Sequence, residues 1–258
     1  MPSKPSHKKK TKPSPRNGHS SMENMDLPPS PLEVDLDNED AGFHSAKLCI
    51  CGNAGVGKTS MLLRYCNNSY VDGGDSTIGV EFKYNTVRAR TGESIKLLIW
   101  DLAGQDRFVA VTQNYFRGAN VILFVFDLGD DTSFKSIVRW LDRAGWTLKT
   151  ETEFGGNDDY TIGYLIGNKS DLEGDAQQVP TDTATAFAKS MNLDYLEISC
   201  KENTNVRESL QAIADRLAQQ NTEWVGAGKG SIFKNPKRKS LDADRSRSSN
   251  GEKTGCAC

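Results

Sequence analysis

The stretch GNAGVGKT (Gly52–Thr59) constrains the fold more than any other part of the chain. It follows the short apolar run Ala46–Cys51 and opens the segment Gly57–Asn67, whose apolar residues recur at helical spacing. Glycines let backbone N–H groups wrap around an anion without side-chain clashes, and the start of a helix adds its positive end. A strand, a glycine-rich turn and a helix in this order therefore predict a phosphate-binding loop.

Strand and helix patterns alternate over residues 46–222. The predicted strands cover residues 46–51, 80–90, 94–101, 121–127, 161–168 and 195–199, and the predicted helices cover 57–67, 133–149, 183–191 and 206–219. This alternation predicts an α/β fold, in which a mostly parallel six-stranded sheet with one antiparallel strand is flanked by helices. Ligands of such folds bind at the carboxyl ends of the strands, so the loops after the strands are expected to carry the chemistry.

The two ends of the chain differ in composition from its middle. Residues 1–20 hold six Lys/Arg and no acid, residues 21–45 hold seven acids and no base, and residues 223–258 are polar and basic. Because such stretches cannot bury enough apolar surface to fold alone, we expect a disordered extension over 1–45, one folded domain over 46–222 and a disordered tail over 223–258. The formal net charge of −2 gives no reason to expect a nucleic-acid partner.

Four cysteines lie within the predicted folded domain, and two of them share one face of the first strand. No second Cys/His pair completes a zinc set with Cys49 and Cys51, which we therefore expect in the core. Scattered single cysteines of this kind fit a reducing, cytosolic environment.

Each position of the glycine-rich loop has a physical role in holding phosphates. Lys58 is placed to reach the β- and γ-phosphates, and the Thr59 hydroxyl is a hard oxygen ligand suited to Mg²⁺. Alone, this loop indicates only a nucleoside triphosphate. The nucleotide-binding residues expected from it are Gly52, Asn53, Ala54, Gly55, Val56, Gly57, Lys58, Thr59 and Ser60.

The loop after the predicted strand 94–101 supplies a second set of residues. Asp101 closes the strand and is expected to hold Mg²⁺, Gly104 leaves a backbone N–H free for a γ-phosphate, and Gln105 is suited to orient an attacking water. An aspartate at a strand end is commonplace alone, but this spacing behind a phosphate-binding loop is not.

Two further loops predict the base that is bound. In Asn168-Lys169-Ser170-Asp171, the Asp171 carboxylate is suited to accept hydrogen bonds from N1–H and the 2-amino group of guanine, which adenine lacks. The loop Ser199-Cys200-Lys201 is expected to donate a backbone N–H to guanine O6, with Lys201 beside the base. The nucleotide is therefore predicted to be GTP or GDP.

Four loops in this order resemble those of the Ras superfamily of small GTPases, over roughly residues 46–221. The stretches STIGVEF (Ser76–Phe82), WDLAGQDRF (Trp100–Phe108) and YFRGA (Tyr115–Ala119) are most similar to the Rab branch. The resemblance implies the G-domain fold of P-loop NTPases, hydrolysis of GTP to GDP and phosphate, and a switch between two nucleotide states.

The resemblance also assigns individual positions. Thr77 matches a threonine that binds Mg²⁺ and senses the γ-phosphate, and Tyr70 matches an aromatic residue that flanks guanine. Phe82, Trp100 and Tyr115 match an aromatic triad on which Rab effectors dock; ordinary packing within the sheet is the competing interpretation, above all for Trp100. The catalytic residues implied in this way are Lys58, Thr77 and Gln105, and the magnesium ligands are Thr59, Thr77 and Asp101.

The chain departs from the Rab pattern at several places. Leu102 and Asp106 stand where Thr and Glu are usual, and Gly74 stands where a tyrosine often covers the phosphates. Ala54 replaces a glycine or serine, and residues 150–160 form a longer, acidic surface loop. None of these changes removes a group that the chemistry needs.

Two other functions compete with a slowly hydrolysing switch. The glycine-rich stretch before Thr77 and the residues Ala54 and Leu102 motivate a membrane-bound scaffold that does not cycle between nucleotides; a signalling GTPase of the Ras or Rho type is a further alternative. A nucleotide kinase is excluded because the chain lacks an arginine-rich lid. Since no arginine is assigned to the active site, we predict low intrinsic turnover.

The last residues, GEKTGCAC, place Cys256 and Cys258 at the tip of a polar tail. Gly255 occupies the position that a CaaX box reserves for cysteine, so that motif is excluded. The ending instead resembles the Rab ending that carries two geranylgeranyl chains, which together make a stable anchor. The basic stretch 234–239 is expected to add attraction to an anionic leaflet, with plain solvated charge as its alternative.

The resemblance implies partners and a location for such a switch. No apolar segment follows the first lysines, which excludes a signal peptide, and the longest apolar run, Val121–Phe126, is too short to span a membrane. We therefore expect the chain on the cytoplasmic leaflet of an endomembrane or the plasma membrane, cycling with the cytosol. The expected protein partners are an exchange factor, a GAP and effectors at the switch regions, together with prenylation machinery and an extractor like the GDP-dissociation inhibitors.

Overall fold

The structure, a computed structural model, describes residues 44–73, 77, 79–104, 114–146, 161–226 and 231–233. Within these residues one six-stranded sheet has the strand order β2-β3-β1-β4-β5-β6. Its strands are β1 (His44–Cys51), β2 (Val80–Arg88), β3 (Ser94–Leu102), β4 (Val121–Asp127), β5 (Ile162–Asn168) and β6 (Asp194–Ile198). Only β2 pairs antiparallel to its neighbour, so the predicted α/β fold with one antiparallel strand is confirmed.

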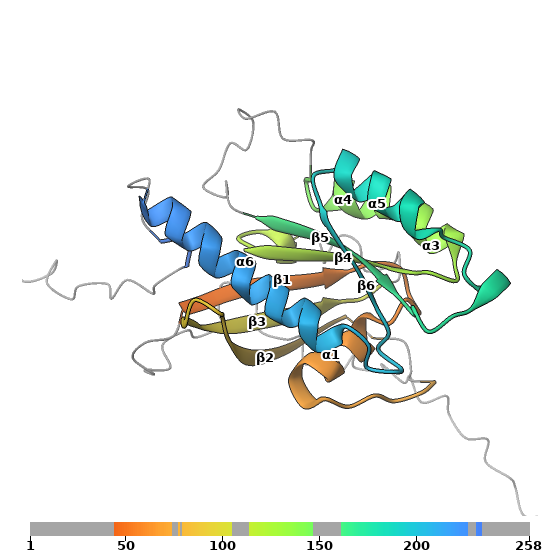
Figure 1. Ribbon diagram of the computed structural model, residues 1–258, viewed down its shortest axis with the longest axis horizontal. Coiled ribbons are helices and arrows are strands. Elements are labelled where there is room, and N and C mark those ends of the chain that lie inside the picture. The colour runs from red at the N-terminus through yellow and green to blue at the C-terminus, as the bar shows by residue number, and fades with distance from the viewer. Residues whose placement is uncertain are drawn as a thin grey trace, which may run out of the picture.

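Helices cover both faces of this sheet (Figure 1). The helices are α1 (Lys58–Asn67), α3 (Asp131–Lys135), α4 (Ile137–Arg143), α5 (Thr181–Ser190) and α6 (Val206–Gly226), with a short 3₁₀ helix at Gly174–Ala176. α1 and α6 pack on one face, and α3, α4 and α5 pack on the other. None of the helices in the described ranges has the length and apolarity that a membrane span requires.

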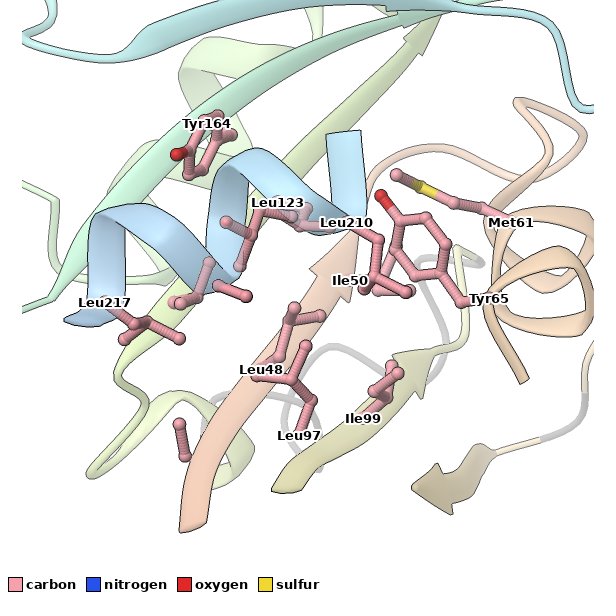
Figure 2. Packing of buried hydrophobic residues seen from close by; sticks show 14 of the residues in the cluster. Leu48, Ile50, Met61, Tyr65, Leu97, Ile99, Leu123, Tyr164, Leu210 and Leu217 are labelled. Atoms are coloured by element: carbon pink, nitrogen blue, oxygen red, sulfur yellow. The ribbon is translucent and has the colours of Figure 1, made fainter. Parts of the chain in front are cut away.

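The alternation of side chains along β1 explains how one strand serves both faces. Leu48 and Ile50 point toward α1 and α6, where they meet Leu210 and other apolar residues of the first core cluster (Figure 2). Cys49 and Cys51 point to the opposite face and belong to the second cluster. Both thiols are fully buried, and burial raises the pKa of Cys49 to about 12, which confirms the prediction that these cysteines are core residues.

The helix predicted over residues 133–149 is wrong in its extent, because the structure divides it into α3 and α4 at Ser136. The Ser136 hydroxyl donates to the Thr132 carbonyl at 2.8 Å, a local bond that competes with regular helix geometry. α4 then ends at Arg143, where Gly145 adopts a φ of 66° and the Trp146 N–H returns to the Leu141 carbonyl.

The folded part continues past the predicted domain boundary at residue 222. α6 extends to Gly226, and Ile232 and Phe233 pack into the first core cluster. At the other boundary, β1 begins at His44, two residues earlier than predicted. The remainder of the predicted N-terminal extension, the loop 150–160 and the tail after Phe233 lie outside the described residues.

Candidate nucleotide-binding site

A pocket of about 340 Å³ opens at the carboxyl ends of the parallel strands, and all four predicted loops line it. Tyr70 and Thr77 line it as well. The predicted site residues that the structure brings together here are Ala54, Gly55, Gly57, Lys58, Thr59, Ser60, Gly104, Asn168, Lys169, Asp171, Cys200 and Lys201. Segments more than 140 positions apart in the sequence therefore meet around one cavity.

Two glycines of the first loop have no room for a side chain. A Cβ at Gly52 would lie 2.1 Å from the Val125 carbonyl oxygen, and one at Gly57 would lie 2.1 Å from the Asn168 amide nitrogen. Both residues also have positive φ, 144° and 97°, which other residues rarely adopt. The loop is therefore pressed against β4 on one side and against the end of β5 on the other.

Lys58 lies under this loop with its side chain almost fully buried. Its ammonium group donates to the Asn53 carbonyl at 2.7 Å, and burial lowers its pKa from the ordinary value. A Cβ on Gly104 would lie 2.6 Å from the Lys58 Nζ and 2.4 Å from the Ala54 nitrogen. The second loop thus approaches the first closely enough that only glycine fits, which leaves Lys58 beside the Gly104 backbone.

The oxygen-bearing side chains of Thr59, Thr77 and Asp101 lie close together beside the same loop. The Thr59 hydroxyl lies 2.7 Å from the Thr77 hydroxyl and donates to Asp101 Oδ2 at 2.5 Å. The other carboxyl oxygen of Asp101 is buried without a hydrogen-bond partner, and burial raises the pKa of Asp101 to about 6. A buried carboxylate oxygen left unpaired beside two hydroxyls fits a small divalent cation that prefers oxygen ligands, such as Mg²⁺.

Asn168 ties three of the four loops together. Its side-chain amide donates to the Val56 carbonyl at 2.8 Å, and its carbonyl oxygen accepts from the Cys200 N–H at 3.2 Å. The residue is buried, so both bonds are shielded from water. Asn168 therefore acts here as a brace, and within the loop Ser199-Cys200-Lys201, from which a backbone N–H was expected to reach guanine, the Cys200 N–H donates to Asn168.

Asp171, the residue predicted to recognise guanine, lines the same pocket. Its Oδ1 accepts from the Ser199 hydroxyl at 2.6 Å, and its Oδ2 lies 4.0 Å from the Lys201 ammonium. Lys169 has a φ of 68° and pairs with Asp127 at 2.5 Å. Ser199 thus holds the Asp171 carboxylate in place, and the carboxylate still lines the pocket. It can therefore accept hydrogen bonds from the N–H groups of a base.

Tyr70 lies at the edge of the pocket, next to the fourth loop. The Arg64 guanidinium lies 5.6 Å from the centre of its ring, and the tyrosine hydroxyl donates to Asp72 at 3.4 Å. Gln105 lies outside the described residues, as do Gly74, Asp106, Arg107, Cys256 and Cys258. The predicted catalytic glutamine and the predicted lipid sites therefore have no geometry here.

The predicted aromatic triad forms a contiguous cluster, but it is mostly covered. Phe82 and Trp100 have ring centres 4.6 Å apart, and Trp100 and Tyr115 have centres 5.3 Å apart. Trp100 is 1% exposed and Tyr115 is 6% exposed, while Phe82 is half-buried. Trp100 and Tyr115 pack into the second core cluster against the sheet, which favours the competing interpretation of ordinary packing for these two rings.

Sequence reasoning missed two residues that hold the pocket together. Arg64 donates from α1 to the carbonyls of Cys200 and Lys201 at 2.7 and 2.9 Å, which fixes the fourth loop. Asp127 pairs with Lys169 from the end of β4. The position of Asp127 at a strand end is a signal that predicts it, whereas no sequence pattern links Arg64 to a loop more than 130 residues away.

The amino-acid sequence of the chain is similar to sequences of known proteins. A model of the Ras family matches residues 47–219. The GTP-binding protein YPTM2 of Zea mays is 43% identical over 178 residues, covering 67% of this chain and 82% of that protein. The Ras-related protein RABD2a of Arabidopsis thaliana is 41% identical over 178 residues, covering 67% and 82%. The Ras-related protein Rab-1A of Dictyostelium discoideum is 38% identical over 189 residues, covering 71% and 88%.

Proposed function

Because the chain belongs to the Ras family of small GTPases, as a Rab-type member, we propose that it is a membrane-anchored switch with slow intrinsic hydrolysis that regulates trafficking. The observation that carries this proposal is the meeting of all four loops around one pocket. Lys58 and Thr59, the proposed phosphate and magnesium ligands, and Asp171, the proposed guanine ligand, all line that pocket, which supports binding of a whole nucleotide.

Thr77 and Gly104 are the two residues that we propose to report which nucleotide is bound. The Thr77 hydroxyl already lies against Thr59, and the Gly104 backbone lies against Lys58. Both positions adjoin segments that carry the family's switches, so a γ-phosphate that contacts them would order those segments and its loss would release them. Effectors that favour the GTP state would read this difference.

Thr59, Thr77 and Asp101 are the residues that we propose to hold Mg²⁺, which when bound neutralises charge on the phosphate oxygens. The unpaired Asp101 oxygen supports this assignment, because a cation replaces the missing hydrogen bond. Lys58 supplies a positive charge in addition to that of Mg²⁺. Its side chain is buried beneath the phosphate-binding loop, so we propose that its ammonium group lies close to the bound phosphates.

The composition of the described pocket lining supports the proposal of slow hydrolysis. No arginine belongs to its described lining, and the Arg64 guanidinium nearby is engaged with carbonyls of the fourth loop. Phosphoryl transfer relies on stabilising charge, and an arginine supplied by a partner typically raises the rate by about 10³–10⁵-fold. We therefore propose that a GAP completes the site.

Replacing Gln105 by Leu is expected to slow single-turnover GTP hydrolysis by at least about tenfold, because the variant no longer orients the attacking water. The measurement is release of phosphate from protein preloaded with GTP, with and without magnesium. Gln219→Leu, an exposed glutamine on α6 remote from the pocket, is the matched control. Equal rates in Gln105→Leu and wild type would contradict a cycling switch and favour the non-cycling scaffold.

Replacing Cys256 and Cys258 together by Ser is expected to move the tagged protein from membranes to the cytosol. We propose that both thiols carry prenyl chains added by prenylation machinery. We also propose that a protein like the GDP-dissociation inhibitors extracts the chain from the membrane and returns it to the cytosol.

One prenyl chain gives only marginal membrane binding, so each single Cys→Ser variant should retain reduced membrane association. Microscopy and membrane fractionation measure this; unchanged membrane association in the double variant would contradict lipid anchoring at these cysteines. The control is Cys66→Ser, which alters a cysteine of α1.

A further inference from the structure

Three residues beyond α6 fold back onto the domain, and we name Ser231–Phe233 the strap. Asn221 on α6 accepts two hydrogen bonds through its Oδ1, from the Ser231 hydroxyl at 2.8 Å and from the Ile232 N–H at 3.1 Å. The Asn120 amide donates to the Ile232 carbonyl at 3.2 Å. Both backbone polar groups of Ile232 are thus satisfied by side chains that are themselves buried.

The apolar side chains of the strap are buried against the start of β1. Ile232 is 6% exposed and Phe233 is 4% exposed, and both belong to the first core cluster. The Phe233 ring stacks on His44 with ring centres 4.5 Å apart and planes 18° apart. Because His44 opens β1, the strap lies at the amino end of the sheet, opposite the nucleotide pocket.

The socket that receives the strap is fixed by bonds that do not involve it. Asn120 Oδ1 accepts from the Lys47 N–H at 2.8 Å, and the Asn120 carbonyl accepts from the Ile162 N–H at 2.9 Å. Asn120 therefore links the middle of β1 to the start of β5 through bonds that do not involve Ile232. In the described part of the domain, the strap is held by hydrogen bonds to Asn120 and Asn221 and by the packing of Ile232 and Phe233.

Because three residues at the end of the described domain depend on two asparagine side chains and on the packing of two apolar side chains, we expect their local opening to cost less free energy than unfolding of the sheet. Once the strap leaves, Ile232 and Phe233 face solvent next to four bases in the sequence, Lys234, Lys237, Arg238 and Lys239. An aliphatic and aromatic pair beside clustered bases has the chemistry that binds anionic lipid surfaces, where apolar side chains enter the interface and bases meet phosphate groups.

We propose that the strap is a membrane-contact element held in reserve, which binds an anionic lipid surface when it leaves its socket. The socket and the lipid compete for the same two side chains, so a membrane that binds only the released strap shifts the equilibrium toward release. The inference rests on the proposed membrane role of the tail, but it does not require prenylation. It adds a contact that strengthens attachment only where the surface is anionic.

The test uses the full chain with Cys256→Ser and Cys258→Ser, so that prenylation plays no part. Binding is measured with vesicles of phosphatidylcholine alone and with vesicles that also contain phosphatidylserine. Asn221→Ala removes both bonds that hold Ser231 and Ile232, and it is expected to raise binding to the anionic vesicles about tenfold. Adding Ile232→Ser and Phe233→Ser to that variant should return binding to the level of the parent chain. Gln219→Ala, on the same helix but away from the strap, is the matched control and should change nothing.

Hydrogen exchange tests release separately from membrane binding. In the parent chain the amides of Ile232 and Phe233 should exchange slowly, because they donate to Asn221 and to the Ser231 hydroxyl. Asn221→Ala should expose them while β4 stays protected. Ser231→Ala, at an exposed position, gives a second and milder release that leaves the core intact.

Three results would overturn the proposal. The first is fast exchange of both strap amides in the parent chain, which would mean that the strap is not docked. The second is release without increased binding to anionic vesicles. The third is an increase that persists after Ile232→Ser and Phe233→Ser, which would assign the binding to the bases alone. None of these outcomes bears on hydrolysis by Gln105, so this inference and the proposed switch fail independently.

Discussion

An Asp171→Asn variant should bind GTP about 10⁴-fold more weakly than the wild type and should bind xanthosine triphosphate instead. The Asp171 carboxylate is held by Ser199 and lines the pocket. It offers only acceptors, which match the N1–H and 2-amino donors of guanine. The asparagine amide places a donor against the 2-amino group, whereas the 2-oxo group of xanthine accepts from that donor.

Equilibrium titration with the three triphosphates of guanosine, xanthosine and adenosine measures this exchange of specificity. The asparagine keeps an oxygen that accepts from Ser199, so the fourth loop should stay in place. Asp130→Asn is the matched control, because Asp130 caps α3 outside the pocket and an asparagine can cap a helix equally well. Retention of full GTP affinity by Asp171→Asn would contradict the assigned role.

Replacing Gly57 by Ala should lower the free energy of unfolding by about 3 kcal/mol or more and nucleotide affinity by at least about 100-fold. The added methyl group would lie 2.1 Å from the Asn168 amide nitrogen, and the backbone has a φ of 97°. Asn168 cannot move aside without breaking its bonds to Val56 and Cys200. One methyl group at Gly57 is therefore expected to disturb the first loop together with the third and fourth loops, which Asn168 joins to it.

Gly55→Ala separates backbone strain from this collision. Gly55 also has a positive φ, 80°, but a Cβ there meets nothing within 4 Å. The free energy of unfolding of Gly55→Ala should therefore fall by only about 1–2 kcal/mol, which is the cost of a non-glycine residue in the left-handed region. Urea unfolding of both variants without added nucleotide makes the comparison. Equal losses would mean that strain, not the contact with Asn168, decides the effect at Gly57.

The parts that sequence reasoning predicted correctly rest on local patterns. The period of apolar residues located every strand of the sheet to within a few residues. The rule that ligands lie at the carboxyl ends of parallel strands predicted that Lys58, Gly104 and Asp171 share one site, and all three line the pocket. These predictions succeed because each depends on spacing within a short stretch and on a topology that parallel sheets share.

The parts that it missed depend on contacts between distant residues. The strap has no periodicity, since three residues cannot show one, and its fit depends on Asn120 and Asn221. The choice between docking and ordinary packing for Trp100, which the sequence left open, depends on how the second core cluster closes over β3. Asn168 lines the pocket, but its side chain also braces Val56 and Cys200, a role that no spacing in the sequence encodes.

The stacking of Phe233 on His44 brings the two ends of the described domain into contact. β1 carries the chain from there to the phosphate loop over eight residues, a distance of about 26 Å at strand geometry. The chain therefore enters and leaves the described domain at the same end of the sheet, opposite the nucleotide pocket. A peptide fused before His44 or after Phe233 would start at that end, away from the nucleotide pocket.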